Sequence, residues 1–173
     1  EALPGATAYS VYFAQRIASG EAASPYPFIA AVGPLTPDSP QAPDPPDLGD
    51  DEIVINRWLA ESLGLADPTT RPAAEAPELT LSYWVMGPRR QLRTRETRFT
   101  LRGVIPTDTP RLDPELMPAY PGLHDAGSCA EWDPGVPIDL RTARQDERLN
   151  AYWEKYRGTP KALITLAKGR ALW

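Results

Sequence analysis

The amino-acid sequence predicts one α+β domain that is rich in short strands and hairpins, with about two short helices and long proline-rich loops. Several short runs alternate in polarity as strands do, whereas few segments show helical spacing. The 173 residues include 21 prolines, which exclude long helices because proline removes a backbone donor and clashes with the preceding helical turn. A chain of this length is typical of a single domain, and we expect one over residues 1–173, with a linker at residues 33–50.

The N-terminal segment predicts a hairpin followed by that linker. Tyr9–Ser19 is rich in aromatic and β-branched residues, and a glycine-containing turn separates it from the apolar run Tyr26–Val32. Pro25 and Pro27 cannot donate hydrogen bonds to a neighbouring strand, so we expect the second strand to lie at an edge of the sheet. Gly33–Asp50 is dense in proline and aspartate, which is typical of an extended connection.

The middle of the chain predicts a strand, a helix and a second hairpin. Ile53–Ile55 is a short apolar run that suits a buried strand. Leu59–Gly64 carries apolar residues at helical spacing and ends at a glycine. Leu79–Val85 alternates with a period of two, a Gly-Pro pair supplies the turn, and Phe99–Pro106 is the returning strand.

The C-terminal part predicts a long irregular segment, a helix and a last strand. Thr107–Asp139 is rich in proline, glycine and aspartate, so its scattered apolar side chains must hold it against the sheet. Asp139–Arg157 has apolar and aromatic residues at spacings of three and four, which predicts one amphipathic helix. Ala162–Ala167 is short and apolar and predicts a central strand.

Two sets of these segments resemble the extracytoplasmic core domain of ABC-transporter permeases of the MacB/FtsX type. The general pattern of the family is similar to Ile53–Asn56, Leu59–Gly64, Leu79–Tyr83 and Phe99–Pro106. A large bacterial subgroup of these permeases is also similar, with more specific motifs, over Leu116–Leu123, Cys129–Asp139 and Tyr152–Ala162. The resemblance spans roughly residues 9–173. It departs at Ala66–Pro77, which is longer and richer in proline than the short Val-Gly-Asp link of the family.

The resemblance implies a domain outside the membrane that is not an enzyme and holds no cofactor or metal. In the family, ATP binding and hydrolysis by a cytoplasmic subunit move the membrane helices, and the extracytoplasmic domain transmits that movement to a substrate or partner. The full-length protein would then be embedded in the bacterial inner or plasma membrane, with this chain on its periplasmic or extracellular face. An alternative is a secreted carbohydrate- or protein-binding module that uses exposed aromatic side chains.

Charge gives a further clue to partners. The net charge of −5 argues against nucleic acid as the main partner, because phosphate binding needs a basic surface. One predicted hairpin nevertheless carries Arg89, Arg90, Arg93, Arg95, Arg98 and Arg102. Such crowding costs stability unless something balances it. Water and salt are the simplest answer, and an acidic partner, anionic head groups or the acidic linker of this chain are the alternatives.

The possible partner surface therefore combines charged and aromatic residues. It comprises Arg89, Arg90, Arg93, Trp132, Tyr152 and Tyr156. Tyr152 and Tyr156 lie one helical turn apart and would present two rings together. Trp132, like Trp153 and Trp173, is expected either to hold a loop locally or to anchor another molecule.

Candidate catalytic and metal-binding residues form no recognised motif. His124, Asp125, Ser128 and Cys129 are the one local set that resembles a nucleophile with a base, but they lie in a Gly/Pro-rich segment without a nucleophile elbow. With one histidine and one cysteine in the chain, a transition-metal site of nitrogen and sulfur ligands is not expected. Two sets of carboxylates remain as weaker candidates, for hydrolysis and for calcium respectively: Asp133 with Asp139, and Asp44, Asp47, Asp50, Asp51 and Glu52.

Overall fold

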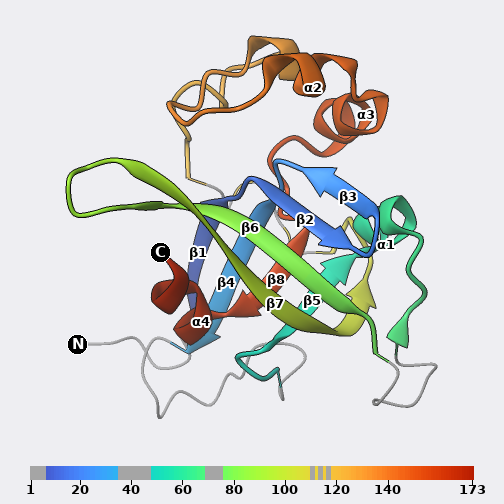
Figure 1. Cartoon of the computed structure of the whole chain (residues 1–173). Helices are drawn as coiled ribbons and strands as arrows, with labels where there is room; N and C mark the ends of the chain where they lie inside the picture. The colour runs from blue at the N-terminus through green and yellow to red at the C-terminus, as the bar shows by residue number, and fades with distance from the viewer. Residues whose placement is uncertain (1–6, 35–47, 69–75, 110–111, 113–114, 116–117) are drawn as a thin grey trace.

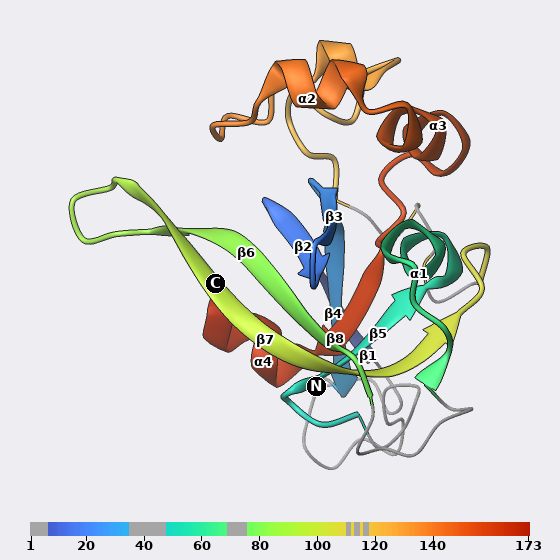
Figure 2. The same ribbon diagram turned by 45° about the vertical axis from the view of Figure 1, so that its right-hand side comes forward.

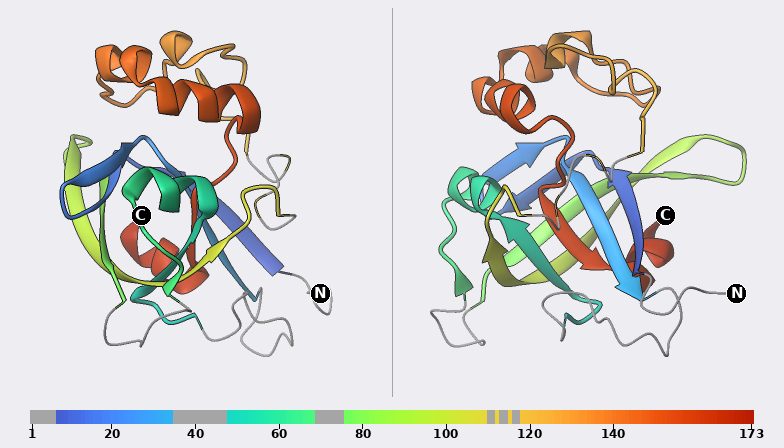
Figure 3. Two further views of the ribbon diagram at one scale, coloured as in Figure 1. Left: turned by 90° about the vertical axis from the view of Figure 1, so that its right-hand side faces the viewer. Right: turned by 180° about the vertical axis from the view of Figure 1, so that it is seen from behind.

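The computed structural model describes residues 7–34, 48–68, 76–109, 112, 115 and 118–173. These residues form a small, β-rich α+β domain around one mixed sheet, shown from four sides in Figures 1, 2 and 3. The strands are β1 (Thr7–Phe13), β2 (Arg16–Ser19), β3 (Ala22–Pro25), β4 (Phe28–Pro34), β5 (Glu52–Asn56), β6 (Glu78–Met86), β7 (Leu92–Ile105) and β8 (Ala162–Thr165). The helices are α1 (Arg57–Leu63), α2 (Leu140–Gln145), α3 (Glu147–Tyr156) and α4 (Leu166–Leu172), with a short 3-10 helix, η5 (Cys129–Glu131).

The strand order is β1-β4-β8-β5-β7-β6-β2-β3. The pairs β4/β8 and β5/β7 are parallel and the other neighbours are antiparallel. Strand β8, almost the last element of the chain, therefore lies in the interior of the sheet between β4 and β5. The expectation of a central strand there is confirmed, and the interior position explains why all four of its residues are buried.

The central strands bury both of their faces. In β5, Ile53 and Ile55 point into one apolar core and Val54 points into a second one on the opposite face. Successive side chains of a strand point to opposite faces, so a strand that is covered on both sides reads as a continuous apolar run. The first core is closed by α1 and α4, and Leu59 and Leu166 lie in it. The helix α1 ends as predicted at Gly64, which adopts a left-handed conformation with φ 67°.

The second core lies between the sheet and residues 118–160, which we call the cap. The cap contains η5, α2 and α3 and lies over one end of the sheet in Figure 1. Its buried side chains include Leu123, Trp132, Leu149 and Trp153. They cover Phe28, Ala30, Val54, Trp84 and Leu163 of the sheet. Much of this segment is irregular, as predicted, and its apolar side chains attach it to the sheet by burial.

The N-terminal hairpin was predicted with the wrong pairing. The chain makes four strands there, because the predicted first strand divides into β1 and β2 and a separate strand, β3, follows. The run Tyr26–Val32 is not an edge strand: β4 has β1 on one side and β8 on the other. Pro25 ends the edge strand β3 and Pro27 precedes β4, so neither proline interrupts an interior ladder. Tyr26 between them has φ 49°, which turns the chain from one strand into the other.

Two predicted elements near the C-terminus are also revised. The single helix over Asp139–Arg157 is two helices, since Asp146 ends α2 and its carboxylate accepts a hydrogen bond from the Leu149 backbone N–H to begin α3. The predicted strand Ala162–Ala167 stops at Thr165, whose hydroxyl begins α4. Helix α4 was missed. The predicted linker at 33–50 begins within β4, and its residues 35–47 lie outside the described residues.

Candidate functional site

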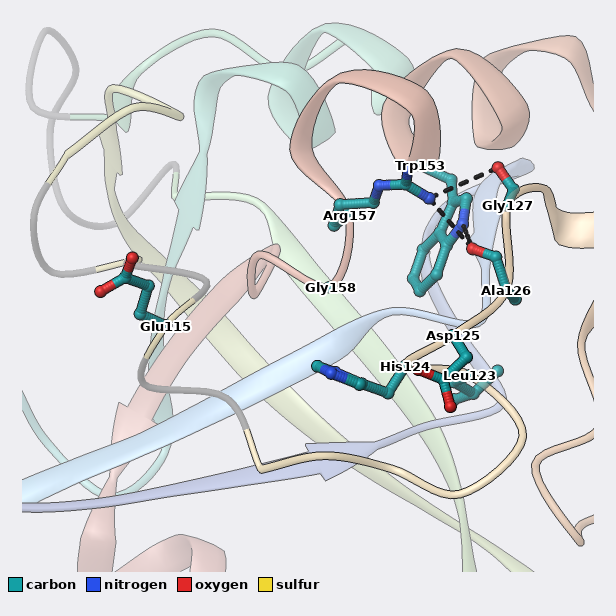
Figure 4. Close-up of a pocket in the computed structure, with 9 residues that line it drawn as sticks. All are labelled: Glu115, Leu123, His124, Asp125, Ala126, Gly127, Trp153, Arg157 and Gly158. Atoms are coloured by element: carbon teal, nitrogen blue, oxygen red, sulfur yellow. Dashed lines mark hydrogen bonds between the residues drawn. The ribbon is translucent and has the colours of Figure 1, made fainter.

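A cavity of about 450 Å³ lies between the irregular residues 123–127 of the cap and the C-terminal end of α3. Figure 4 shows the residues that line it: Glu115, Leu123, His124, Asp125, Ala126, Gly127, Trp153, Arg157 and Gly158. The Arg157 guanidinium donates to the carbonyl oxygens of Ala126 at 3.0 Å and Gly127 at 3.4 Å, and the Trp153 indole donates to Ala126 at 3.1 Å. These bonds hold Ala126 and Gly127 against Trp153 of α3 and Arg157, so part of the donor capacity at the cavity is used within its own wall.

The nucleophile-and-base set is not assembled around this cavity. His124 and Asp125 line it and are exposed, whereas Cys129 is fully buried in η5 and its thiol faces the Leu149 carbonyl at 3.8 Å. Burial raises the pKa of the Cys129 thiol to about 12, which keeps it protonated and unreactive at neutral pH. Ser128 instead contacts Glu131 at 3.5 Å. The four residues therefore do not form a catalytic constellation in this structure.

The carboxylate candidates have structural partners. Asp139 begins α2, where it accepts hydrogen bonds from the Thr142 hydroxyl and the Arg141 backbone N–H, both at 2.9 Å. These bonds lower the pKa of Asp139, the Thr142 hydroxyl having the larger effect. The exposed Asp133 anchors its loop through its backbone N–H, which donates to the Gly122 carbonyl at 2.9 Å.

The acidic residues just before β5 and at its start also have partners where they are described. Asp50 accepts from the Thr165 hydroxyl, Lys168 pairs with Asp51 at 2.7 Å, and Arg102 pairs with Glu52 at 3.8 Å. Asp44 and Asp47 lie outside the described residues. Within the described ranges, no group of three or more His, Cys, Asp or Glu side chains is arranged to hold a metal ion.

A buried polar cluster joins the cap to the sheet, and we call its residues Asn56, Trp58, Tyr152, Thr159 and Lys161 the clasp. Asn56, the last residue of β5, caps α1 by accepting from the Leu59 N–H at 2.8 Å. Its amide also donates to the Tyr152 hydroxyl at 2.9 Å, and that hydroxyl donates to the Thr159 carbonyl at 2.9 Å. One side chain thus connects a sheet strand, a helix and the cap.

Lys161 completes the clasp and is 2 % exposed. Its ammonium lies 4.5 Å from the ring centre of Trp58 and 4.8 Å from that of Tyr152, and it donates to the Ser24 hydroxyl at 3.1 Å. Burial lowers the pKa of Lys161 from 10.5 to about 7, although Asp146 and Cys129 favour its charged form. Lys161 does not line the cavity, so its unusual environment belongs to the packing of the cap on the sheet.

A third feature is the outer part of the β6–β7 hairpin, residues 85–95, which we call the arm. Strand β2 pairs with β6 only at Thr80–Ser82, so the hairpin continues beyond it as a two-stranded ribbon that extends past the rest of the sheet in Figures 1 and 2. Arg89, Arg90, Arg93 and Arg95 are exposed on the arm. None of these four arginines is paired with a carboxylate among the described residues.

The predicted partner-surface residues are divided among these features. Arg89, Arg90 and Arg93 lie together on the arm, whereas Trp132 and Tyr152 are 3 % and 2 % exposed and present no ring to solvent. Trp132 packs edge-on against Trp153 at 4.9 Å, and the half-buried Tyr156 lies 5.1 Å from Tyr152. Trp173, at the end of α4, stacks on Tyr12 at 4.3 Å. These tryptophans hold segments of this chain locally.

Sequence reasoning missed the two polar residues at the centre of the clasp and two apolar residues on the arm. Asn56 comes directly after the apolar run Ile53–Ile55, and Lys161 comes directly before the apolar run Ala162–Ile164. A lone polar residue at the end of such a run was the available signal. Met86 and Leu92, which are 64 % and 37 % exposed, flank the hairpin turn on either side. Apolar residues on both sides of a charged turn were the signal there.

Comparisons of this chain with protein-family models, curated proteins and solved structures gave no match. Across the ranges that the structure describes, no helix has the length and apolar character needed to cross a membrane.

Proposed function

We propose that this chain is the extracytoplasmic domain of a MacB/FtsX-like ABC permease, where it transmits ATP-driven movement to a substrate or partner without catalysing a reaction. The observation that carries the proposal is the clasp. A domain that transmits force needs its parts to move as one body. The clasp joins β5, α1, α3, β3 and the residues that lead into β8 through buried hydrogen bonds. Relative movement of these elements would break the bonds and leave buried polar atoms without partners. The free-energy cost of doing so opposes the movement.

The positions of the family-like segments support the same proposal. The first set falls on β5, α1, β6 and β7, which are adjacent: β5 pairs with β7, β7 pairs with β6, and α1 directly follows β5. Of the second set, Cys129–Asp139 and Tyr152–Ala162 pack on each other through Trp132 and Trp153. Each set of resembling segments therefore lies together in space, as expected if the resemblance reflects a shared fold.

The alternative of a binding module with exposed aromatics is less well supported. Trp132 and Trp153, the rings proposed for such a site, are 3 % and 4 % exposed. A carbohydrate or protein surface requires rings that solvent reaches, because stacking buries the free face of the ring. The arm extends beyond the rest of the sheet in Figure 1, and its four exposed arginines have no carboxylate partner among the described residues.

Labelling of the full-length protein in whole cells tests the proposal. Thr94→Cys places a thiol on the exposed arm, and a membrane-impermeant maleimide is expected to label it in intact cells. The unsubstituted protein is the matched control, because Cys129 is fully buried and burial raises its pKa to about 12. Labelling only after lysis, or recovery of the full-length protein outside the membrane fraction, would contradict an extracytoplasmic permease domain.

A second measurement addresses the coupling role. The full-length protein is purified in detergent together with any ATP-binding subunit that associates with it. ATP hydrolysis by the complex is then compared between the unsubstituted protein and Tyr152→Phe, which removes the clasp hydroxyl and keeps the ring. We expect the complex to form in both cases and the rate of ATP hydrolysis to differ between them. Absence of any associated ATP-binding subunit, or turnover of a substrate by this chain alone, would refute the proposal.

A further inference from the structure

We propose that the arm is a membrane-docking element that places its tip on an anionic lipid surface. The inference does not depend on the proposed function, because it concerns the surface chemistry of the arm alone. Three independent observations carry it: the segregation of charge, an exposed apolar pair at the tip, and an arginine held in a left-handed backbone conformation.

Charge is segregated between the arm and the body. Residues 85–95 contain four arginines and no acidic residue, so the remainder of a chain with net charge −5 carries −9. An anionic surface therefore attracts the arm and repels the body, which would orient the domain with its arm toward the lipid. Two arginines of β7 that lie closer to the body do have carboxylate partners. Arg98 pairs with Glu78 at 3.6 Å and Arg102 pairs with Glu52 at 3.8 Å.

The tip of the arm also carries exposed apolar side chains. Met86 and Leu92 are directly opposite each other in the ladder, so both side chains lie on the same face of the ribbon. They form the last pair before the turn and are 64 % and 37 % exposed. Apolar side chains with adjacent arginines match the acyl-chain boundary and the phosphate groups of an anionic bilayer.

The turn holds an arginine where the backbone favours glycine. The Arg90 N–H donates to the Gly87 carbonyl at 2.9 Å, the Gly87 N–H donates to the Gln91 carbonyl at 2.8 Å, and Arg90 has φ 57°. A three-residue hairpin turn of this kind requires a left-handed residue at its third position, which glycine adopts without strain. Arginine at this position costs conformational energy, which is consistent with a use for its charge at the tip.

The shape of the arm favours a lipid surface over an acidic protein. A stable protein interface buries about 800 Å² on each partner, usually over a broad surface. The arm is a narrow, convex ribbon of two strands, and none of its residues lines the described cavity. A flat and fluid bilayer surface can receive such a tip without a complementary groove.

Vesicle flotation of this chain tests the inference. We expect binding to vesicles of phosphatidylcholine mixed with phosphatidylserine, weaker binding as salt is raised, and no binding to phosphatidylcholine alone. The double variant R89S/R93S is compared with R98S/R102S, which removes the same charge from the proximal part of the same hairpin. We expect partition to fall by roughly 25-fold for the arm variant, at about fivefold per arginine, and by less than about twofold for the control.

Two further variants separate the contributions of charge and apolar contact. R90G removes a charge while relieving strain, so its thermal stability should be equal or higher and its partition roughly fivefold weaker. M86S/L92S keeps every charge and should also weaken partition. Equal losses in the arm and control variants, absence of binding to the anionic vesicles at low salt, or binding to polyglutamate with no binding to vesicles would each overturn the inference.

Discussion

The clasp and the arm place their basic side chains in opposite environments. Lys161 in the clasp is fully enclosed, and its ammonium has two aromatic rings and one hydroxyl as neighbours. The arginines of the arm are exposed and have no carboxylate partners among the described residues. A buried cation affects the free energy of unfolding, because its desolvation must be balanced within the fold. An exposed cation leaves folding almost unchanged and is available to bind another molecule.

The largest expected effect comes from emptying the centre of the clasp. Tyr152→Ala removes a ring that is 2 % exposed and the hydroxyl that links Asn56 to Thr159. We expect the free energy of unfolding to fall by about 3–5 kcal/mol, as for other buried aromatic truncations, measured by urea denaturation. Tyr152→Phe is the control, with an expected loss of about 1–3 kcal/mol for the unpaired polar atoms. Equal stability of Tyr152→Ala and the unsubstituted chain would show that the clasp does not hold the cap.

A smaller effect is expected at Asn56, which combines two roles. Asn56→Ala removes the cap of α1 and the donor to Tyr152, and we expect a loss of about 1–3 kcal/mol in the free energy of unfolding. Asn56→Ser retains a capping oxygen and should lose less. If the serine variant is as unstable as the alanine variant, the contact with Tyr152 is the dominant contribution and the cap is secondary.

The buried ammonium predicts a pH dependence. The pKa of Lys161 is lowered from 10.5 to about 7 by burial, so between these values the unfolded chain binds a proton that the folded chain does not. The free energy of unfolding attributable to this group therefore rises with pH across that window, with a slope of up to about 1.4 kcal/mol per pH unit.

Denaturation between pH 7 and 9 measures this effect, with Lys161→Met as the comparison. The upper limit avoids the Cys129 thiol, whose pKa burial raises from 9.0 to about 12 and which opposes the trend at higher pH. The groups that act on Lys161 electrostatically are Asp146 and Cys129, and neither is changed in the variant. The methionine variant should show a shallower slope, and identical slopes would indicate that Lys161 remains charged in the folded domain.

The smallest effect on stability is expected at the arm. R89S/R93S and R98S/R102S should each change the free energy of unfolding by less than about 0.5 kcal/mol per residue, because exposed charges and exposed ion pairs contribute little. Thermal denaturation of the two double variants checks this. A marked loss of stability in the arm variant alone would mean that the arginines hold the hairpin together, and the contrast between clasp and arm would then fail.

Much of the local structure follows from the sequence. The predicted elements form at the apolar run Ile53–Ile55, at the helical spacing before Gly64 and at the alternating residues of β6. These signals depend on periodicity and turn chemistry within a few residues. The arginine-rich hairpin was located for the same reason. The break between α2 and α3 at Asp146 is also a local feature of the sequence. It was missed because an aspartate among helically spaced apolar residues can lie either inside one helix or at the start of a second one.

The sequence by itself determined that this chain makes short strands, short helices and a charged hairpin, because those properties arise between near neighbours. Only the tertiary structure decided that β4 is an interior strand, since its partner β8 enters from more than 100 residues away in the chain. It likewise decided that Asn56, Tyr152 and Lys161 meet, and that Trp132 is buried while Arg93 is exposed. Such contacts depend on which distant surfaces bury each other, and local periodicity does not specify that pairing.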